Sequence, residues 1–394
     1  MDDLFRGIDV VVTALFARPK AIKKLYFAHV GSVRPVLALR ELRRSYAKDQ
    51  QQLSLIWMLE NLRLTQVTLP HDQIYALLGL CSPEEVAKNP IRYDLEPKEV
   101  YRTSTVSHTQ LHNDLDFLGL CTPAQRDDLL SGPLEDLMSR PFKAPSWVPN
   151  WQSKHLRRCL GLGKLHNEHQ FFCASGAIPV DPTFKGDELM ISGILVDRIK
   201  VLGDFCRPDR RHELSDANSK LFQQYFDFWL TPARHPMPYK DDASQIETFV
   251  RTISLLGIYF EPLPLPNELL GMFHRWCRGS TLGEQLEQRG LGRNNSASWA
   301  NGTKTFMGMK RLMSWEPFVT EQGYIGLARE KCSVGDEIWI IGGCSVPILL
   351  STKAESPSSH YEVRGETFLD GFMFGEIMNM ERVKRRSIRR VTLV

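Results

Sequence analysis

The chain has 394 residues, 42% of them hydrophobic and 24% charged, and its 49 basic and 46 acidic residues give a net charge of +3. These values are typical of a globular protein and exclude a wholly disordered or collagen-like chain. No apolar run reaches the roughly 18 residues of a membrane span, and the short apolar run 10–17 follows acidic residues, so neither a transmembrane helix nor a signal peptide is predicted.

The first third of the chain predicts helices. Residues 36–46 and 51–64 are rich in Leu, Arg, Gln and Glu, which favour helix formation. Asp72 is expected to cap a helix over 73–78 that ends at Gly79.

Two further helices are marked by their first residues. In Ser82-Pro83-Glu84-Glu85, serine is the expected N-cap and proline the first helical residue, and Glu85 is expected to reach back to the cap as a capping box. The next helix is predicted to begin at Pro97 and to run to about Leu118.

A candidate metal site lies on this last predicted helix. His108 and His112 are four residues apart and would share one face, with Asp116 one turn further on. The alternative is that the two histidines flank the apolar stripe and form hydrogen bonds within the packing. Because no second group of ligands is identifiable, the packing interpretation is favoured and no metal-binding residue is assigned.

The middle of the chain alternates between extended and helical patterns. Five prolines between 121 and 165 exclude long helices there. Short strands are expected at 171–175 and 189–201, the second rich in Ile and Val. Apolar residues at helical spacing predict helices at 216–230, 244–256 and 267–277, and the polar stretch 281–304 predicts an exposed loop.

The last part of the chain predicts strands joined by tight turns. The expected strands are 337–341, 346–351, 361–364 and 366–369. Short strands in this arrangement favour a small antiparallel β-barrel or a curved sheet.

The predicted fold class is therefore α+β, with helical regions packed against this β structure. Residues 1–138 are expected to form a mainly helical region, and residues 139–205 and 310–378 together a β-rich unit. Residues 206–309 are expected to form a helical insertion with a polar loop, and residues 381–394 a basic tail.

The tail determines the sign of the net charge. It holds six basic residues against one acidic residue, so the rest of the chain has a net charge of −2. A solvated terminus is the favoured interpretation. A nuclear-import or nucleic-acid patch is the second, and attraction to a membrane surface is the third, which would need an adjacent apolar anchor that the sequence lacks.

Catalytic signatures are absent from the sequence. There is no Walker loop, no H-E-x-x-H and no G-x-S-x-G motif, and a nucleophile paired with a histidine is recognised only by geometry. The eight cysteines are at least twelve positions apart, which excludes zinc-finger spacing and, without a signal peptide, favours reduced thiols in an intracellular protein. No catalytic residue and no cofactor is assigned.

Several segments resemble blocks of the fungal heterokaryon incompatibility proteins, the HET-domain family. Residues 72–80, DQIYALLGL, resemble the family block DKVYALLGL, with Gln73 in place of Lys and His71 in place of the usual preceding Arg. Residues 145–151, PSWVPNW, resemble the P-S-W-x-P-x-W signature, which is the most specific match. Further matching blocks lie at 172–176, 189–197, 318–327, 335–336, 346–347 and 361–376, so the resemblance covers about residues 50–378.

The stretches that define the family's N-terminal domain, Y-x-A-L-S-Y-x-W-G and W-I-D-x-x-C-I-x-Q, do not occur in the sequence. The resemblance thus implies the downstream arm of such a protein without its death-inducing domain. The family role that it implies is allorecognition and regulated cell death in filamentous fungi. No functional residue can be carried over from the family.

The sequence therefore predicts a soluble, non-catalytic regulatory or protein-interaction arm of a heterokaryon-incompatibility-type protein. An unidentified protein partner, no membrane and a cytoplasmic location are expected, or a nuclear one through the tail. One alternative is an enzyme with a split site, in which His108, His112 and Asp116 would converge on an open cavity. The other is a protein that binds nucleic acid through residues 381–394.

Overall fold

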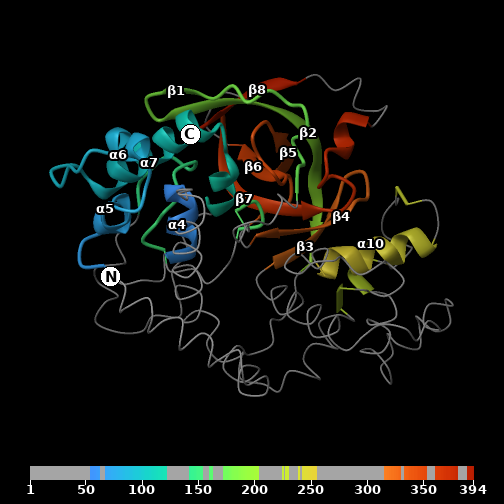
Figure 1. Ribbon diagram of the computed structural model, residues 1–394. Coiled ribbons are helices and arrows are strands. Elements are labelled where there is room, and N and C mark those ends of the chain that lie inside the picture. The colour runs from blue at the N-terminus through green and yellow to red at the C-terminus, as the bar shows by residue number, and fades with distance from the viewer. Residues whose placement is uncertain are drawn as a thin grey trace, which may run out of the picture. The chain divides into compact units, whose positions relative to one another are not determined.

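A computed structural model shows the fold of the chain (Figure 1). The structure describes residues 54–62, 67–121, 142–153, 159–162, 172–203, 224–225, 227–229, 238–239, 242–254, 315–329, 332–352, 360–379 and 388–394. The chain divides into two compact units, one made of residues 1–170 with 184–188 and the other of residues 171–183 with 189–394.

The described part of the first unit is mainly helical, apart from the short β1–β2 segment 184–188. Its helices are α4 (Leu55–Leu62), α5 (Asp72–Leu78), α6 (Pro83–Lys88) and α7 (Pro97–His112), followed by a 3₁₀ turn at Asp116–Leu120. Every residue of α4 is buried, and α4 packs against α5 and α7. This short helix is thus buried on all sides, with its polar residues Glu60 and Asn61 as well as its apolar ones.

The ends of α6 and α7 follow local sequence signals. The side chain of Ser82 caps α6 by accepting a hydrogen bond from the backbone N–H of Glu85 at 3.1 Å. A capping box is found on α7, where the side chains and backbones of Glu96 and Glu99 pair reciprocally. Helix α7 ends at His112 because Asn113 adopts a left-handed conformation with φ of 51°.

The second unit is built on strands. These are β1 (Thr183–Lys185, whose last two residues belong to the first unit), β2 (Glu188–Leu202), β3 (Trp315–Thr320), β4 (Ile325–Arg329), β5 (Glu337–Ile341), β6 (Ile348–Thr352), β7 (His360–Leu369) and β8 (Arg389–Leu393). One helix, α10 (Asp242–Ser254), lies against β4, and residues 224–225 and 227–229 are also helical.

The strands pair in a closed circuit. Around it the order is β2, β3, β4, β7, β6 and β5, and β5 pairs again with β2. Strand β2 serves both ends because Gly193–Arg198 pair with β5, whereas Ile199–Leu202 pair with β3 across a shift in register. All pairings in the circuit are antiparallel, which agrees with the predicted α+β class.

The inside of this circuit is a continuous apolar core. Its buried side chains come from strands and from the segments that cover them: Ala174, Ile178, Ile194, Val196, Ile199, Phe318, Ala328, Cys332, Ile338, Ile340, Leu349, Leu369, Phe372 and Ile377. Gly326 is required on β4, because a Cβ there would overlap the ring of Phe318 and the carbonyl oxygen of Phe368. The missing side chain lets three strands approach closely.

Several predicted elements differ in the structure. Residues 171–175 were expected to form a strand, but the described residues 174–177 form turns, in which Ala174 donates to the carbonyl of Ser345. The strands expected at 361–364 and 366–369 are one strand, β7, which continues through Gly365 at a positive φ.

The end of the chain also differs from the prediction. Residues 389–393, expected within a basic tail, form β8, which pairs with β2 and with β7. Val391 and Leu393 are buried, whereas Arg389 and Arg390 are exposed, so two of the basic residues belong to the start of a strand.

Other expectations are outside the described residues: the helices at 36–46 and 267–277 and the loop at 281–304. The helix expected at 244–256 is confirmed by α10. Among the residues that the structure describes, none of the helices has the length and apolar character that crossing a membrane requires.

Candidate functional site

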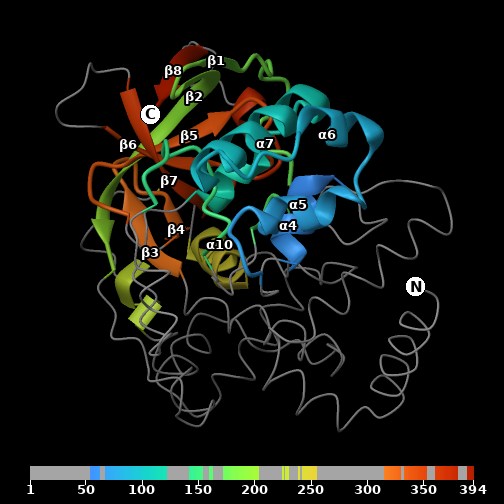
Figure 2. The same ribbon diagram turned by 90° about the vertical axis from the view of Figure 1, so that its left-hand side faces the viewer.

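Helices α6 and α7 lie side by side in the first unit (Figure 2). Two hydrogen bonds that involve Lys88 link them. The Lys88 ammonium donates to the side chain of Gln110 at 2.9 Å, and the Ser107 hydroxyl donates to the carbonyl of Lys88 at 3.1 Å. The side-chain amide of Asn89 donates to the carbonyl of Glu85 at 2.7 Å and closes the end of α6.

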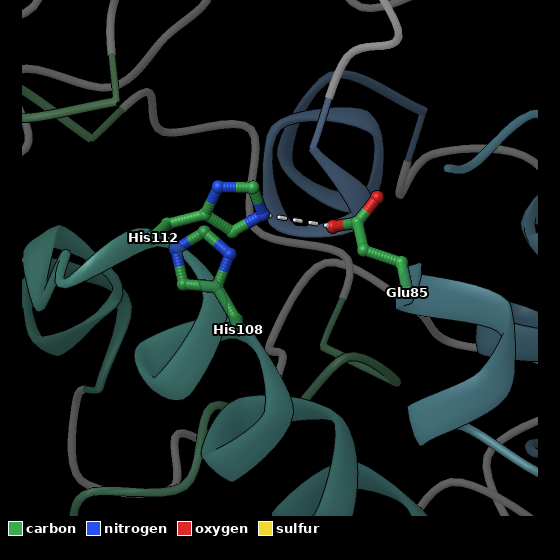
Figure 3. A group of neighbouring side chains, drawn as sticks. All are labelled: Glu85, His108 and His112. Carbon is green, nitrogen blue, oxygen red and sulfur yellow. Dashed lines mark hydrogen bonds and ion pairs between the residues drawn. The ribbon is translucent and has the colours of Figure 1, made fainter. Parts of the chain in front are cut away.

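This pairing brings three side chains together: Glu85 from α6, and His108 and His112 from α7 (Figure 3). One ligand atom from each lies within 4.8 Å of the others. The imidazole rings of His108 and His112 have centroids 4.7 Å apart, and His112 Nε2 lies 3.2 Å from Glu85 Oε1. The four-residue spacing predicted from the sequence therefore does place both histidines on one face.

Glu85 is the member of this group that the sequence did not predict. Its position marked it as a capping residue, but its Oε1 instead accepts hydrogen bonds from the backbone N–H of Leu55, at 2.9 Å, and from His112. The Ser82-Pro83 signal fixes where Glu85 lies on α6. Only the packing of α6 against α4 and α7 shows where its carboxylate points.

Asp116 is not part of the group. Because α7 ends at His112, Asp116 belongs to the 3₁₀ turn and not to the next turn of the same helix. Its buried carboxylate lies against Gly161, where a Cβ would come within 2.6 Å of Oδ1. The structure thus does not bring His108, His112 and Asp116 together, and Glu85 takes the third position.

Glu85 and His112 stabilise each other's charged forms. Burial favours the neutral form of Glu85, but the hydrogen bonds from His112 and from the N–H of Leu55, with the charges of both imidazoles, lower its pKa overall. The hydrogen bond to Glu85 raises the pKa of His112 against the opposing effect of burial. The carboxylate is therefore ionised at neutral pH and available as a ligand or hydrogen-bond acceptor.

His108 is the least satisfied member. Its side chain is 2% exposed, and neither ring nitrogen has a hydrogen-bond partner among the described residues. Asp114 Oδ2 is 3.9 Å from His108 Nε2, which is too far for a hydrogen bond. A buried polar atom without a partner costs about 1–3 kcal/mol, so this arrangement needs an explanation.

The thiol of Cys81 lies next to Glu85. Burial raises the pKa of Cys81 to about 12, and the neighbouring Glu85 carboxylate adds to the effect. The thiol is therefore protonated at neutral pH and is a poor nucleophile in this environment.

Comparison with known proteins gives two matches. Residues 273–388 match the family described as the Het-6 beta-barrel domain, a range that includes β3–β7 of the second unit. The chain is also 22% identical over 379 residues to heterokaryon incompatibility protein 6 (OR allele) of Neurospora crassa. No solved structure matches.

The second match covers 84% of this chain and 52% of the Neurospora protein, so the chain spans about half the length of that curated relative. It extends over both compact units, whereas the domain match falls within the second unit. The resemblance predicted from the sequence is confirmed at the level of similarity: one segment matches the Het-6 beta-barrel domain, and most of the chain is similar to a heterokaryon incompatibility protein.

Proposed function

We propose that the chain takes part in heterokaryon incompatibility, the response that limits fusion between genetically different fungal cells and ends in regulated cell death. The similarity to heterokaryon incompatibility protein 6 over 84% of the chain carries this proposal. A match of that extent covers the helical unit as well as the strands, so it concerns more than one shared domain.

Within that response we propose a non-catalytic regulatory or protein-interaction role in the cytoplasm, with an effector activity supplied by a different domain. Two observations support it. The sequence holds none of the nucleophile motifs named above, and the Cys81 thiol beside Glu85 is protonated at neutral pH. A partner protein would then bind this chain and respond to its conformational state.

Gene deletion in the fungus that encodes the chain tests the role in incompatibility. Strains with and without the gene are paired with strains of different genotype, and growth of the fused colonies and uptake of a vital dye are scored. We expect at least one pairing that normally dies to survive without the gene, and restoring the gene to restore death. Unchanged outcomes in every pairing would contradict the proposal.

The non-catalytic role is tested separately, with variants at buried polar residues reintroduced into the deletion strain. Asp116→Asn and Glu85→Gln keep the shape of the side chain and remove its charge. If the role is non-catalytic, any variant that loses function should also lose thermal stability. A variant with an unchanged melting temperature and no incompatibility response would favour an enzyme instead.

A further inference from the structure

We propose that Glu85, His108 and His112 form a zinc site that joins α6 to α7. The proposal rests on the geometry of these three residues and does not depend on a role in heterokaryon incompatibility. It concerns a site within the first compact unit.

The first argument is the state of His108. Its ring is almost completely buried, yet neither nitrogen has a hydrogen-bond partner among the described residues, and the Asp114 carboxylate is 3.9 Å from Nε2. A histidine that served only in packing would direct one nitrogen to a carbonyl or hydroxyl group. Here the ring lies beside that of His112 and close to the Glu85 carboxylate (Figure 3), where a cation would satisfy it.

The second argument is distance. A tetrahedral zinc ion with bonds of about 2.0–2.2 Å to nitrogen and oxygen holds its ligand atoms about 3.4 Å apart. Glu85 Oε1 and His112 Nε2 are already 3.2 Å apart, and all three ligand atoms lie within 4.8 Å of one another. Small side-chain rotations would bring the group to the separation that zinc requires.

The ligand chemistry selects the class of ion. Two imidazoles and one carboxylate suit zinc and related transition metals. Magnesium and calcium prefer six or more oxygen ligands, which this group does not offer. His112 is 38% exposed, so the ion can enter from solvent, and a water molecule would complete the tetrahedron.

The site would also explain why the side chain of Glu85 does not cap α6. Its carboxylate binds the N–H of Leu55 on α4 and faces the two histidines of α7. An ion held by Glu85 would thus tie together α6 and α7, and through Glu85 the start of α4.

Zinc binding by the purified full chain tests the proposal. The protein is treated with a chelator, and zinc chloride is added back in competition with a chromogenic zinc chelator. We expect zinc to bind at neutral pH and to raise the melting temperature. In Glu85→Gln and His112→Gln, the affinity of this site should fall by more than about a hundredfold, because even residues that only support metal ligands account for about tenfold to a hundredfold.

Two variants provide matched controls. His71→Gln removes a histidine of the same unit whose Nε2 pairs with the carbonyl of Leu95 at 2.8 Å. Asp116→Asn removes a buried carboxylate that lies against Gly161. Both should bind zinc as the unchanged chain does. Equal affinity and stoichiometry in the unchanged chain and in His112→Gln would overturn the proposal.

A measurement on the unchanged chain covers the case in which the variants do not fold. X-ray absorption of the zinc-loaded protein should show nitrogen and oxygen ligands at about 2.0–2.1 Å with the outer scattering of imidazole. Sulfur at about 2.3 Å would overturn this ligand set and point to Cys81 or another thiol. Binding only at millimolar zinc would also overturn it.

Discussion

Arg329 and Glu366 form an ion pair in the interior of the second unit. Arg329 lies on β4 and Glu366 on β7, and their side chains are 6% and 0% exposed. The guanidinium donates to Glu366 Oε1 and lies over the ring of Trp315, 4.4 Å from its centre. The aromatic face and the carboxylate together replace the water that the cation loses on burial.

Replacing Glu366 by Gln should therefore destabilise the protein strongly. The substitution keeps the shape of the side chain but leaves the buried charge of Arg329 without its carboxylate, which costs about 3–5 kcal/mol when a buried pair is broken. Urea unfolding followed by circular dichroism measures the loss.

Glu362 offers a control on the same strand. It pairs with Arg364 at 3.3 Å, and its side chain is 37% exposed, so solvent screens the interaction. Glu362→Gln should change the free energy of unfolding by less than about 1 kcal/mol. Equal effects of the two substitutions would contradict the argument that burial makes the Arg329–Glu366 pair important.

At the scale of elements, the segment 145–151 anchors the first unit through Trp147. This side chain is fully buried, its indole N–H donates to the carbonyl of Asp187 at 2.8 Å, and its ring lies 5.4 Å from that of Phe184. Asp187 and Phe184 belong to the part of the β1–β2 hairpin that is counted with this unit. The tryptophan thus connects two segments that are distant in the sequence.

Trp147→Ala should cost about 3–5 kcal/mol of unfolding free energy, as truncation of a large buried aromatic side chain does. Trp147→Phe is the comparison, because it keeps most of the ring contact and loses the hydrogen bond, for about 1–2 kcal/mol. Urea unfolding of both variants measures these losses of unfolding free energy. If Trp147→Ala unfolded at the same urea concentration as the unchanged chain, the segment would not be a structural anchor.

Elements with strong local signals were predictable from the sequence. Ser82-Pro83 marks the start of α6, Pro97 marks the start of α7, and the Ile-rich run 337–341 is a strand with the predicted bounds. The end of α7 was not predictable, because Asn113 takes the left-handed conformation within an otherwise continuous helical pattern. By ending the helix, Asn113 places Asp116 on a different element from the two histidines.

Two of the three residues of the candidate site, His108 and His112, were predictable from the sequence. The spacing of His108 and His112 follows from helix geometry alone, and the structure confirms that they share a face. Glu85 joins them through the packing of two helices, which no local pattern records. Strand β8 was missed in a similar way, because its five residues gain their stability from pairing with strands far away in the chain.

At the scale of the whole molecule, β8 connects the end of the described chain to its middle. It pairs antiparallel with β2 through Leu189–Gly193 and parallel with β7 through His360 and Tyr361. Arg390 adds an ion pair to Asp181 at 3.0 Å. Residues 389–394 are thus part of the folded sheet, and a test of nucleic-acid binding through the basic residues should replace their charges instead of removing the segment.

Removing residues 389–394 should destabilise the second unit by about 3 kcal/mol or more. Val391 and Leu393 are 3% and 0% exposed, and each buried aliphatic side chain contributes about 1.5–3 kcal/mol. The truncation also leaves backbone groups of β2 and β7 unpaired at a sheet edge, which favours aggregation. Arg389→Gln is the control, because it changes an exposed side chain and keeps the strand. Urea unfolding and light scattering should show a less stable, aggregating truncated chain beside an unaffected control, whereas equal midpoints for both would mean that β8 contributes little to the fold.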